Sequence, residues 1–369
     1  SDLSHTTFEA RIFSYPKKEI GMKVLYLFNK VLGKTVEEAQ RGQGHDSWLF
    51  GMLRLRKFGI QTDFLEIEKF IPNGLARFLR KHILTMHYAH IPLFPFFFKY
   101  DVVFTSTAYG SLVLKAFFHI KSFKWVILDF NLLGTLQERT TRKQRIFDWA
   151  IRKGADGIVA ISQAEADALK LRFPNLKDKI IFLHEATDTE FFKPRAVAEK
   201  KQIITVGNYA RDFDTIIHAI EEIDINLLIV GKFPENKLKS LPPYVKAVQL
   251  NHEEMVRAYA ESMIAVISLK TKDTYFDSVG TLSLGEAMSM GKATIVTHTK
   301  SMESYIYDGI DGIFVNREDV AQMRNAIVFL LKNDAKRRDL GQKARQFALQ
   351  KLDPDVFAKH LAIFLKSVV

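Results

Sequence analysis

The amino-acid sequence predicts an α/β protein of two domains, each built around a parallel sheet. The chain has 369 residues, which is more than a single hydrophobic core usually serves. Short apolar segments alternate with helical segments along both halves, as in parallel, doubly wound sheets. A second strand-to-glycine turn, ending at Gly207, restarts this alternation. We therefore expect two domains rather than one continuous sheet.

The first half contains five predicted strands with helical segments between them. The strands are expected at residues 23–28, 62–67, 101–105, 125–128 and 158–161. A helix is predicted at 111–118, and an amphipathic segment covers 48–58. Ser162 follows the fifth strand and has a side chain suited to a helix N-cap.

The second half repeats the pattern. Strands are predicted at 202–206, 226–230, 245–249, 264–269 and 293–297, and helices at 213–223, 253–262, 318–331, 334–351 and 356–368. Pro194 follows a mixed-charge run and marks a linker near residues 192–201. We therefore assign residues 1–195 to a first domain and 196–352 to a second.

Composition restricts the functional classes. The chain has no cysteine, which excludes disulfides and thiolate chemistry and suits a reducing compartment. No run of 18 or more apolar residues could span a bilayer, and no segment has the order of a signal peptide. The residues before Met22 are expected to be an extension of the fold.

The positive charge is concentrated in the first half. Residues 1–195 hold 30 Lys and Arg against 20 Asp and Glu, a balance of +10, whereas residues 196–369 hold 23 against 22, a balance of +1. A basic half favours an anionic partner such as a membrane surface, a lipid phosphate or a nucleic acid. The basic residues are dispersed and no recognised nucleic-acid module is present, so a nucleic acid is the least favoured of these.

Residues 277–315 carry the most informative motif. The small residues Gly280, Thr281 and Ser283, with Leu282 between them, lead into a predicted helix. A helix N-terminus presents backbone N–H donors and partial positive charge, so this loop is suited to a diphosphate. Glu286 stands about one and a half turns further on. A carboxylate there can accept two hydrogen bonds from a ribose diol.

The whole motif resembles the nucleotide-sugar site of the GT-B glycosyltransferases of the retaining, family-4 type, known as glycosyl transferases group 1. Its parts occur in the family's order: the glycine loop, Glu286-Ala287-Met288, the Gly291-Lys292 turn, the strand at 293–297 and the acidic turn at Asp311-Gly312. The resemblance implies two Rossmann-like domains facing a central cleft. It also implies a C-terminal helix, residues 353–369, that crosses back to the first domain.

The turn after the strand at 202–206 provides further donor-site candidates. In the family, this turn carries a basic residue to the donor diphosphate, and Arg211 has the forked geometry that matches two phosphate oxygens. Asn208 lies in the same turn, and Lys270, after the strand at 264–269, is a second basic candidate. Asp212 is expected to cap the following helix.

Two candidate catalytic residues lie in the first domain. His45 belongs to the segment 41–46, where the family places a glycine-rich loop facing the acceptor; it is expected to be a base, an acceptor contact, a cap or a core histidine. Asp129 directly follows the strand at 125–128, at the edge where α/β sheets keep their sites. Retaining relatives usually have a histidine near that point, so Asp129 as general base would indicate inversion.

Two other positions depart from the family pattern. Ser278 stands where the family often has a glutamate that points at the donor sugar. His184-Glu185-Ala186 replaces the usual Asn-Gly at the end of the first domain, in a segment that we interpret as a linker anchored by Phe191 and Phe192. The overall pattern still favours retention.

Neither a metal nor a nucleotide-triphosphate loop is predicted. The Asp-x-Asp pairs at Asp212–Asp214 and Asp353–Asp355 lie at predicted helix starts, where capping explains them. Residues 285–292 have the wrong spacing for a Walker loop, and the eleven histidines show no metalloprotease spacing. We expect no cofactor other than the donor substrate, a UDP- or GDP-sugar.

Residues 78–98 combine basic side chains with an aromatic-rich apolar run. This composition suits insertion into a membrane interface, although a buried element would have the same composition. With the basic first half, it favours a peripheral position on the inner face of the plasma membrane. The resemblance implies a cytoplasmic hexosyltransferase, which we expect to be metal-independent. Its acceptor is expected to be a lipid-linked or polysaccharide-precursor saccharide.

Other functions remain open at this point. One is an inverting, glucuronosyl-type transferase with Asp129 as base, and another is a sugar-nucleotide epimerase, which shares the two-domain fold. A third is a non-catalytic, membrane-associated scaffold that binds nucleotides. A scaffold would tolerate loss of Glu286 and Asp129, whereas an epimerase would turn over the donor without an acceptor.

Overall fold

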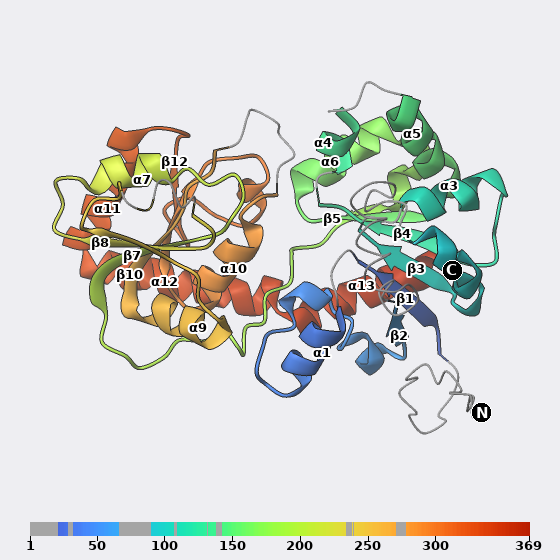
Figure 1. Cartoon of the computed structure of the whole chain (residues 1–369), viewed down its shortest axis with the longest axis horizontal. Helices are drawn as coiled ribbons and strands as arrows, with labels where there is room; N and C mark the ends of the chain where they lie inside the picture. Colours follow the sequence, from blue (N-terminus) through green and yellow to red (C-terminus); the bar gives the residue numbers. More distant parts are fainter. Residues whose placement is uncertain are drawn as a thin grey trace, which may run out of the picture.

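The chain folds into two α/β domains, each with its own six-stranded parallel sheet. The computed structural model describes residues 21–28, 32–65, 90–106, 109–130, 132–137, 142–233, 238, 240–270 and 278–369. Figure 1 shows the two sheets as separate bodies joined by the linker after β6 and by the helices α12 and α13. The predicted architecture of two Rossmann-like domains is therefore confirmed.

The first sheet has the strand order β2-β1-β3-β4-β5-β6, and every neighbouring pair is parallel. Its strands are β1 (Lys23–Leu27), β2 (Gln61–Phe64), β3 (Val102–Thr105), β4 (Lys124–Leu128), β5 (Gly157–Ala160) and β6 (Ile180–Phe182). β3, β4 and β5 consist almost entirely of buried apolar residues because helices cover both faces of the sheet.

Helices surround the first sheet, and those at 109–117 and 163–172 correspond to predicted helices. They are α1 (Leu32–Gln40), α3 (Tyr109–Phe117), α4 (Leu132–Gln137), α5 (Arg142–Gly154) and α6 (Gln163–Arg172), with 3₁₀ segments η4 (Ile91–Lys99) and η5 (Pro174–Lys179). The amphipathic segment 48–58 instead divides into two short 3₁₀ turns, η1 (Ser47–Leu49) and η2 (Leu55–Phe58). The chain adopts positive φ at Phe50 and Gly51 between them, and a regular helix cannot continue through that conformation.

The second sheet has the order β12-β11-β10-β7-β8-β9 and is also entirely parallel. Its strands are β7 (Lys200–Val206), β8 (Asn226–Val230), β9 (Val245–Val248), β10 (Ser262–Ile267), β11 (Ala293–Thr297) and β12 (Ile313–Val315). Its helices are α7 (Phe213–Ile220), α9 (His252–Glu261), α10 (Thr281–Ser289), α11 (Val320–Lys332) and α12 (Asp334–Phe347), with a 3₁₀ turn, η6 (Met302–Ser304).

The last helix returns to the first domain. α12 runs into a π-helical turn, η7 (Ala348–Leu352), and then into α13 (Pro354–Val368). Phe357, Leu361 and Leu365 of α13 are buried in the same apolar cluster as Val24 and Tyr26 of β1. α13 therefore stabilises the first sheet although it follows the second one in sequence.

Local signals at the helix starts are confirmed in the structure. The side chains of Ser162 and Asp212 accept hydrogen bonds from the backbone N–H groups of Glu165 and Thr215, and Asp353 accepts one from Asp355. In the described residues, no helix is both long and apolar enough to cross a membrane. Residues 66–67 of the second predicted strand and 78–89 of the aromatic run lie outside the described residues.

Candidate active site

The strand order of the second sheet predicts where its ligand site should lie. From β7, the chain proceeds to β8 and β9 on one side and then returns to β10 and β11 on the other. Ligands of open parallel sheets bind at the carboxyl edge where the order reverses, because the loops diverge there. The loops after β7 and β10 meet at this edge through a backbone bridge between Arg211 and Leu269. All the predicted donor-site residues before α10 lie on these two loops.

Gly207 and Arg211 form one unit at the end of β7. Nε of Arg211 donates a hydrogen bond to the carbonyl of Val206 at 3.0 Å, so the guanidinium folds back over the turn. A Cβ on Gly207 would lie 2.3 Å from that Nε, and Gly207 has φ of +141°. The backbone conformation therefore favours glycine here, and a Cβ would displace the Arg211 guanidinium from its position over the turn.

The N-terminus of α10 lies directly against this unit. Gly280, the N-cap, has φ of +97°, and a Cβ there would press on Ile267, Leu269 and Met302. Ser283, in the first turn, accepts a hydrogen bond from Nη2 of Arg211 at 3.0 Å and donates one to the carbonyl of Gly280 at 3.1 Å. Leu282 is partly buried in the same turn. The structure thus brings Arg211 and the loop 280–283 together, as predicted.

Glu286 lies beneath this turn and is 3% exposed. The hydroxyl of Tyr259, on α9, lies 3.1 Å from Oε2 of Glu286 and 3.2 Å from the carbonyl oxygen of Ser283, so it is within hydrogen-bond distance of both. The pKa of Glu286 is raised to about 8, chiefly by burial and also by the nearby charge of Glu185, while the Tyr259 hydrogen bond and Arg211 oppose the shift. A carboxyl group is thus positioned behind the helix N-terminus and held largely in its protonated form at neutral pH.

Glu185 belongs to this site, although no sequence motif predicted a binding role for it. It comes from the linker after β6 and is 5% exposed. Its Oε2 accepts a hydrogen bond from Oγ1 of Thr281, the first residue of α10, at 2.5 Å. In the sequence, the only sign of this role was that His184-Glu185-Ala186 departs from the family pattern. The position of Glu185 in the site follows from the packing of the linker against α10.

The backbone of Glu185 is also fixed between the domains. Its N–H donates to the hydroxyl of Tyr305 at 2.8 Å, and that hydroxyl donates to the carbonyl of Ile161 at 2.6 Å. Ile161 directly follows β5 of the first sheet. A buried carboxylate is therefore held at the α10 N-terminus by groups from both domains, where the positive end of the helix stabilises negative charge.

Asn208 and Lys270 lie at the rim of the candidate site. Oδ1 of Asn208 accepts a hydrogen bond from the backbone N–H of Lys232, which joins the turn after β7 to the end of β8. The side chain of Lys270 is exposed, and its backbone N–H donates to the carbonyl of Ala210 at 2.9 Å. Asn208 thus stabilises the turn after β7. The ammonium group of Lys270, the residue after Leu269, faces the solvent.

Asp129 has a structural partner in the first domain. It follows β4, whereas the strand order of the first sheet reverses between β1 and β3. The residue is 1% exposed. Its Oδ1 accepts a hydrogen bond from the backbone N–H of Leu132, the first residue of α4, at 2.5 Å. This contact is that of a helix cap.

His45 packs at the junction of the two domains. Its ring is 3% exposed and lies 5.1 Å from the ring of Phe192, in the linker, and 4.8 Å from that of His252, at the start of α9. Nearby, the backbone N–H of Asp46 donates to Asp188. These contacts correspond to the core histidine among the expected roles. Across the described ranges, no group of three or more His, Asp or Glu side chains is arranged to hold a metal ion.

Comparisons with known proteins agree with this geometry. The family model of the glycosyl transferases group 1 matches residues 200–333, which include β7, Arg211, the loop 280–283 and Glu286. Among relatives, the uncharacterized glycosyltransferase MJ1178 of Methanocaldococcus jannaschii is 22% identical over 60% of this chain and 63% of its own length. The uncharacterized glycosyltransferase MJ1069 of the same organism is 25% identical over 67% of this chain and 70% of its own. The chain thus covers less than two thirds of the first relative.

Solved structures of similar fold cover almost the whole chain. Alr3699/HepE of Anabaena, solved with UDP, has a TM-score of 0.71 at 14% identity and covers 94% of this chain and 100% of its own. Sucrose-phosphate synthase of Thermosynechococcus elongatus has a TM-score of 0.70 at 16% identity, and the match covers 94% of this chain and 99% of the synthase chain. At such identities these structures support the fold alone. The chain therefore has the GT-B fold and carries, over residues 200–333, the domain of the glycosyl transferases group 1.

Proposed function

We propose that the chain transfers a sugar from a nucleotide-diphosphate sugar to a saccharide acceptor. The observation that carries this proposal is the convergence of Arg211, the α10 N-terminus and Glu286 at the strand-order reversal of the second sheet. Residues 196–352 would hold the donor, residues 1–195 the acceptor, and residues 353–369 would join the two. The matched family model supports the reaction class.

Each group has a role that its chemistry fits. The N-terminal turn of α10 and Arg211 would bind the diphosphate, since fixed dipoles and a guanidinium stabilise phosphate oxygens. The same groups would stabilise the negative charge that develops on the departing diphosphate, without a metal ion. Glu286 would receive the ribose hydroxyls. HepE was solved with UDP and with UDP-glucose, so a UDP-hexose is the first donor to test, ahead of a GDP-sugar.

Glu185 would face the reacting end of this donor. The Thr281 hydroxyl lies within hydrogen-bond distance of both Oε2 of Glu185 and the carbonyl oxygen of Ser278, the position where the family motif often has a glutamate. The linker thus brings a carboxylate close to the place where the motif lacks one. We assign to Glu185 the part of a contact to donor-sugar hydroxyls, and we favour transfer with retention.

The surface of the first domain favours an acceptor that is a lipid-linked or polysaccharide-precursor saccharide at the cytoplasmic face of the plasma membrane. Phe117 and Phe118 at the end of α3 are 64% and 63% exposed, and Phe98 of η4, which packs against α3, is 53% exposed. Large exposed aromatics in a domain with a charge balance of +10 suit an anionic lipid surface.

A thermal-shift panel with UDP, GDP, ADP, CMP and their sugars tests the donor site. A ligand that binds only the folded state raises the melting temperature by mass action. We expect a selective rise with one nucleotide diphosphate and its sugar, reduced in Arg211→Gln. No rise with any nucleotide, in the presence and absence of lipid vesicles, would contradict the donor site and favour a scaffold.

A further inference from the structure

A cavity of about 180 Å³ lies between the two connections that join the domains. Phe182, Leu183 and His184 line it from the first connection, at the end of β6 and the start of the linker. Lys351 of η7, together with Val356, Phe357 and His360 of α13, lines it from the second. Both covalent connections between the domains therefore contribute walls to this hinge cavity.

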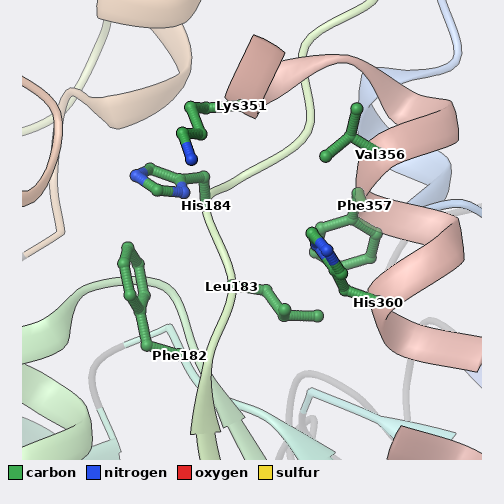
Figure 2. Close-up of a pocket in the computed structure, with 7 residues that line it drawn as sticks. All are labelled: Phe182, Leu183, His184, Lys351, Val356, Phe357 and His360. Carbon is green, nitrogen blue, oxygen red and sulfur yellow. The ribbon is translucent and has the colours of Figure 1, made fainter. Parts of the chain in front are cut away.

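The hinge cavity has one apolar side and one side lined by nitrogen-bearing side chains. Phe182, Leu183, Val356 and Phe357 contribute carbon atoms, whereas His184, Lys351 and His360 contribute nitrogen atoms. Figure 2 shows the Lys351 side chain extending toward the ring of His184, with His360 approaching from α13. The described part of the chain places no carboxylate within ion-pair distance of Lys351 or His360, and no acidic residue lines the cavity.

The acidic residues in the turn before α13 already have other partners. Asp353 accepts hydrogen bonds from Thr189 and from the backbone N–H of Asp355. Asp355 in turn forms an ion pair with Lys57 at 2.7 Å. The positive charge around the hinge cavity is therefore not balanced by these carboxylates.

His184 is held in a defined orientation toward this charge. Its Nε2 lies 2.9 Å from the carbonyl oxygen of Ser304, which can only accept, so Nε2 is the donor in this contact. Burial, together with the charges of Lys351 and His360, lowers the pKa of His184 to about 4, while the hydrogen bond to Ser304 opposes the shift. His184 is therefore neutral near pH 7, with its proton on Nε2, and forms a polar but uncharged part of the lining.

The volume and the lining together define a ligand class. A cavity of roughly 150 Å³ is enough to bind benzene, so 180 Å³ accommodates a ring or a short carbon chain. We propose that the hinge cavity binds a small phosphate monoester, with its carbon body on the apolar side and its phosphate against Lys351 and His360. Phosphate suits this place because these two side chains approach from different elements and can each donate a hydrogen bond to it.

Binding there has a consequence for domain motion. The ligand would contact the linker through His184, the π-helical turn through Lys351 and α13 through His360. Closure of a two-domain enzyme must change the backbone of both connections, and π-helical turns are frequent at functional sites. A bound phosphate monoester would thus restrain the hinge from a site separate from the donor.

Titration calorimetry of the full chain with phenyl phosphate tests this proposal. We expect saturable binding that weakens about tenfold or more in Lys351→Gln/His360→Gln, because two charge-assisted contacts are lost. Lys359→Gln, a neighbouring exposed cation on α13 that does not line the cavity, is the matched control and should bind as the wild type does. Inorganic phosphate and phenol should each bind more weakly than phenyl phosphate, since each lacks one half of the ligand.

Arg211→Gln separates this site from the donor site. Binding that persists in Arg211→Gln and is lost in Lys351→Gln/His360→Gln supports the hinge cavity. Binding that is lost in Arg211→Gln but unaffected by Lys351→Gln/His360→Gln, or no binding at millimolar concentration, would overturn it. As a second readout, phenyl phosphate should shift the ring resonances of His184 and His360, assigned with single His→Gln variants; unchanged resonances at saturation would also overturn it.

Discussion

Nη2 of Arg211 donates a hydrogen bond to Oγ of Ser283 at 3.0 Å, although the two residues are 72 positions apart. This contact joins the turn after β7 to the N-terminus of α10 across the strand-order reversal of the second sheet. The guanidinium is thereby already directed at the helix end where a diphosphate would lie. A donor would find the cationic group in place, so little side-chain entropy would be lost on binding.

Loss of the Arg211 guanidinium should weaken the binding of nucleotide diphosphates. Arg211→Gln should cost about 1.5–3 kcal/mol for UDP, since a hydrogen bond to a charged group is lost. Uridine, which has no phosphate, should lose almost nothing. Calorimetry with UDP and uridine measures the difference, and an equal loss for both ligands would place Arg211 away from the diphosphate.

Gly207→Ala should reproduce the Arg211→Gln effect without touching the guanidinium. A Cβ there would lie 2.3 Å from Nε of Arg211, and alanine rarely adopts the φ of +141° found at this position. We expect UDP affinity to fall together with the melting temperature. Gly309→Ala, at another positive-φ glycine but with open space around it, controls for backbone strain and should leave UDP affinity unchanged.

Glu286 should be required for the nucleotide rather than for the fold alone. Glu286→Ala removes the acceptor proposed for the ribose diol and should weaken UDP binding by ~1–3 kcal/mol, roughly 5- to 150-fold, because two hydrogen bonds to a neutral carboxyl group are lost. Glu222→Ala, at an exposed glutamate of the same domain, should have no effect. Wild-type UDP affinity in a folded Glu286→Ala variant would remove Glu286 from the site.

The pKa of Glu286 predicts a pH-dependent stability. In the folded protein this pKa is raised from 4.5 to about 8, so between these values the folded state keeps a proton that the unfolded state releases. The contribution of this group to the free energy of unfolding is therefore complete below pH 4.5, and it is lost as the pH rises toward 8. Urea denaturation from pH 5 to 8 should show a stability advantage of Glu286→Gln over the wild type that grows with pH. A constant difference would contradict the raised pKa.

Asp129 should behave as a helix cap. Asp129→Ala should lower the free energy of unfolding by about 1 kcal/mol, because Leu132 loses the acceptor of its backbone N–H. Asp129→Asn keeps an oxygen in that position, so both stability and sugar transfer should remain close to wild type. Loss of transfer in a stable Asp129→Asn variant would instead identify Asp129 as the general base and favour inversion.

The exposed aromatics of the first domain should contribute to membrane binding. Phe117→Ser/Phe118→Ser should reduce partitioning onto anionic vesicles by about tenfold or more, since each buried phenyl ring contributes ~1.5–3 kcal/mol. Phe329→Ser, at an exposed phenylalanine of the second domain, is the control. Vesicle sedimentation measures both, and equal partitioning of the double variant and the wild type would exclude this surface.

The sequence by itself determined the features that depend on neighbouring residues. Apolar runs placed ten parallel strands within a few residues, because fully buried strands must be apolar along their length. The three-residue edge strands β6 and β12 were not predicted. Ser162, Asp212 and Asp353 were predictable as caps, since a cap joins residues two or three positions apart. The loop 280–283 and Glu286 were also visible as a local motif.

Only the tertiary structure decided which distant residues meet. Glu185 contacts Thr281, 96 positions later, because the linker after β6 packs against α10. His45 was a candidate base in the sequence, but it packs between Phe192 and His252 once the domains come together. Positive φ at Phe50 and Gly51 divided a segment whose apolar pattern is helical. Local patterns record backbone preference and burial, whereas contacts of this range follow from strand order and domain packing, which no short segment encodes.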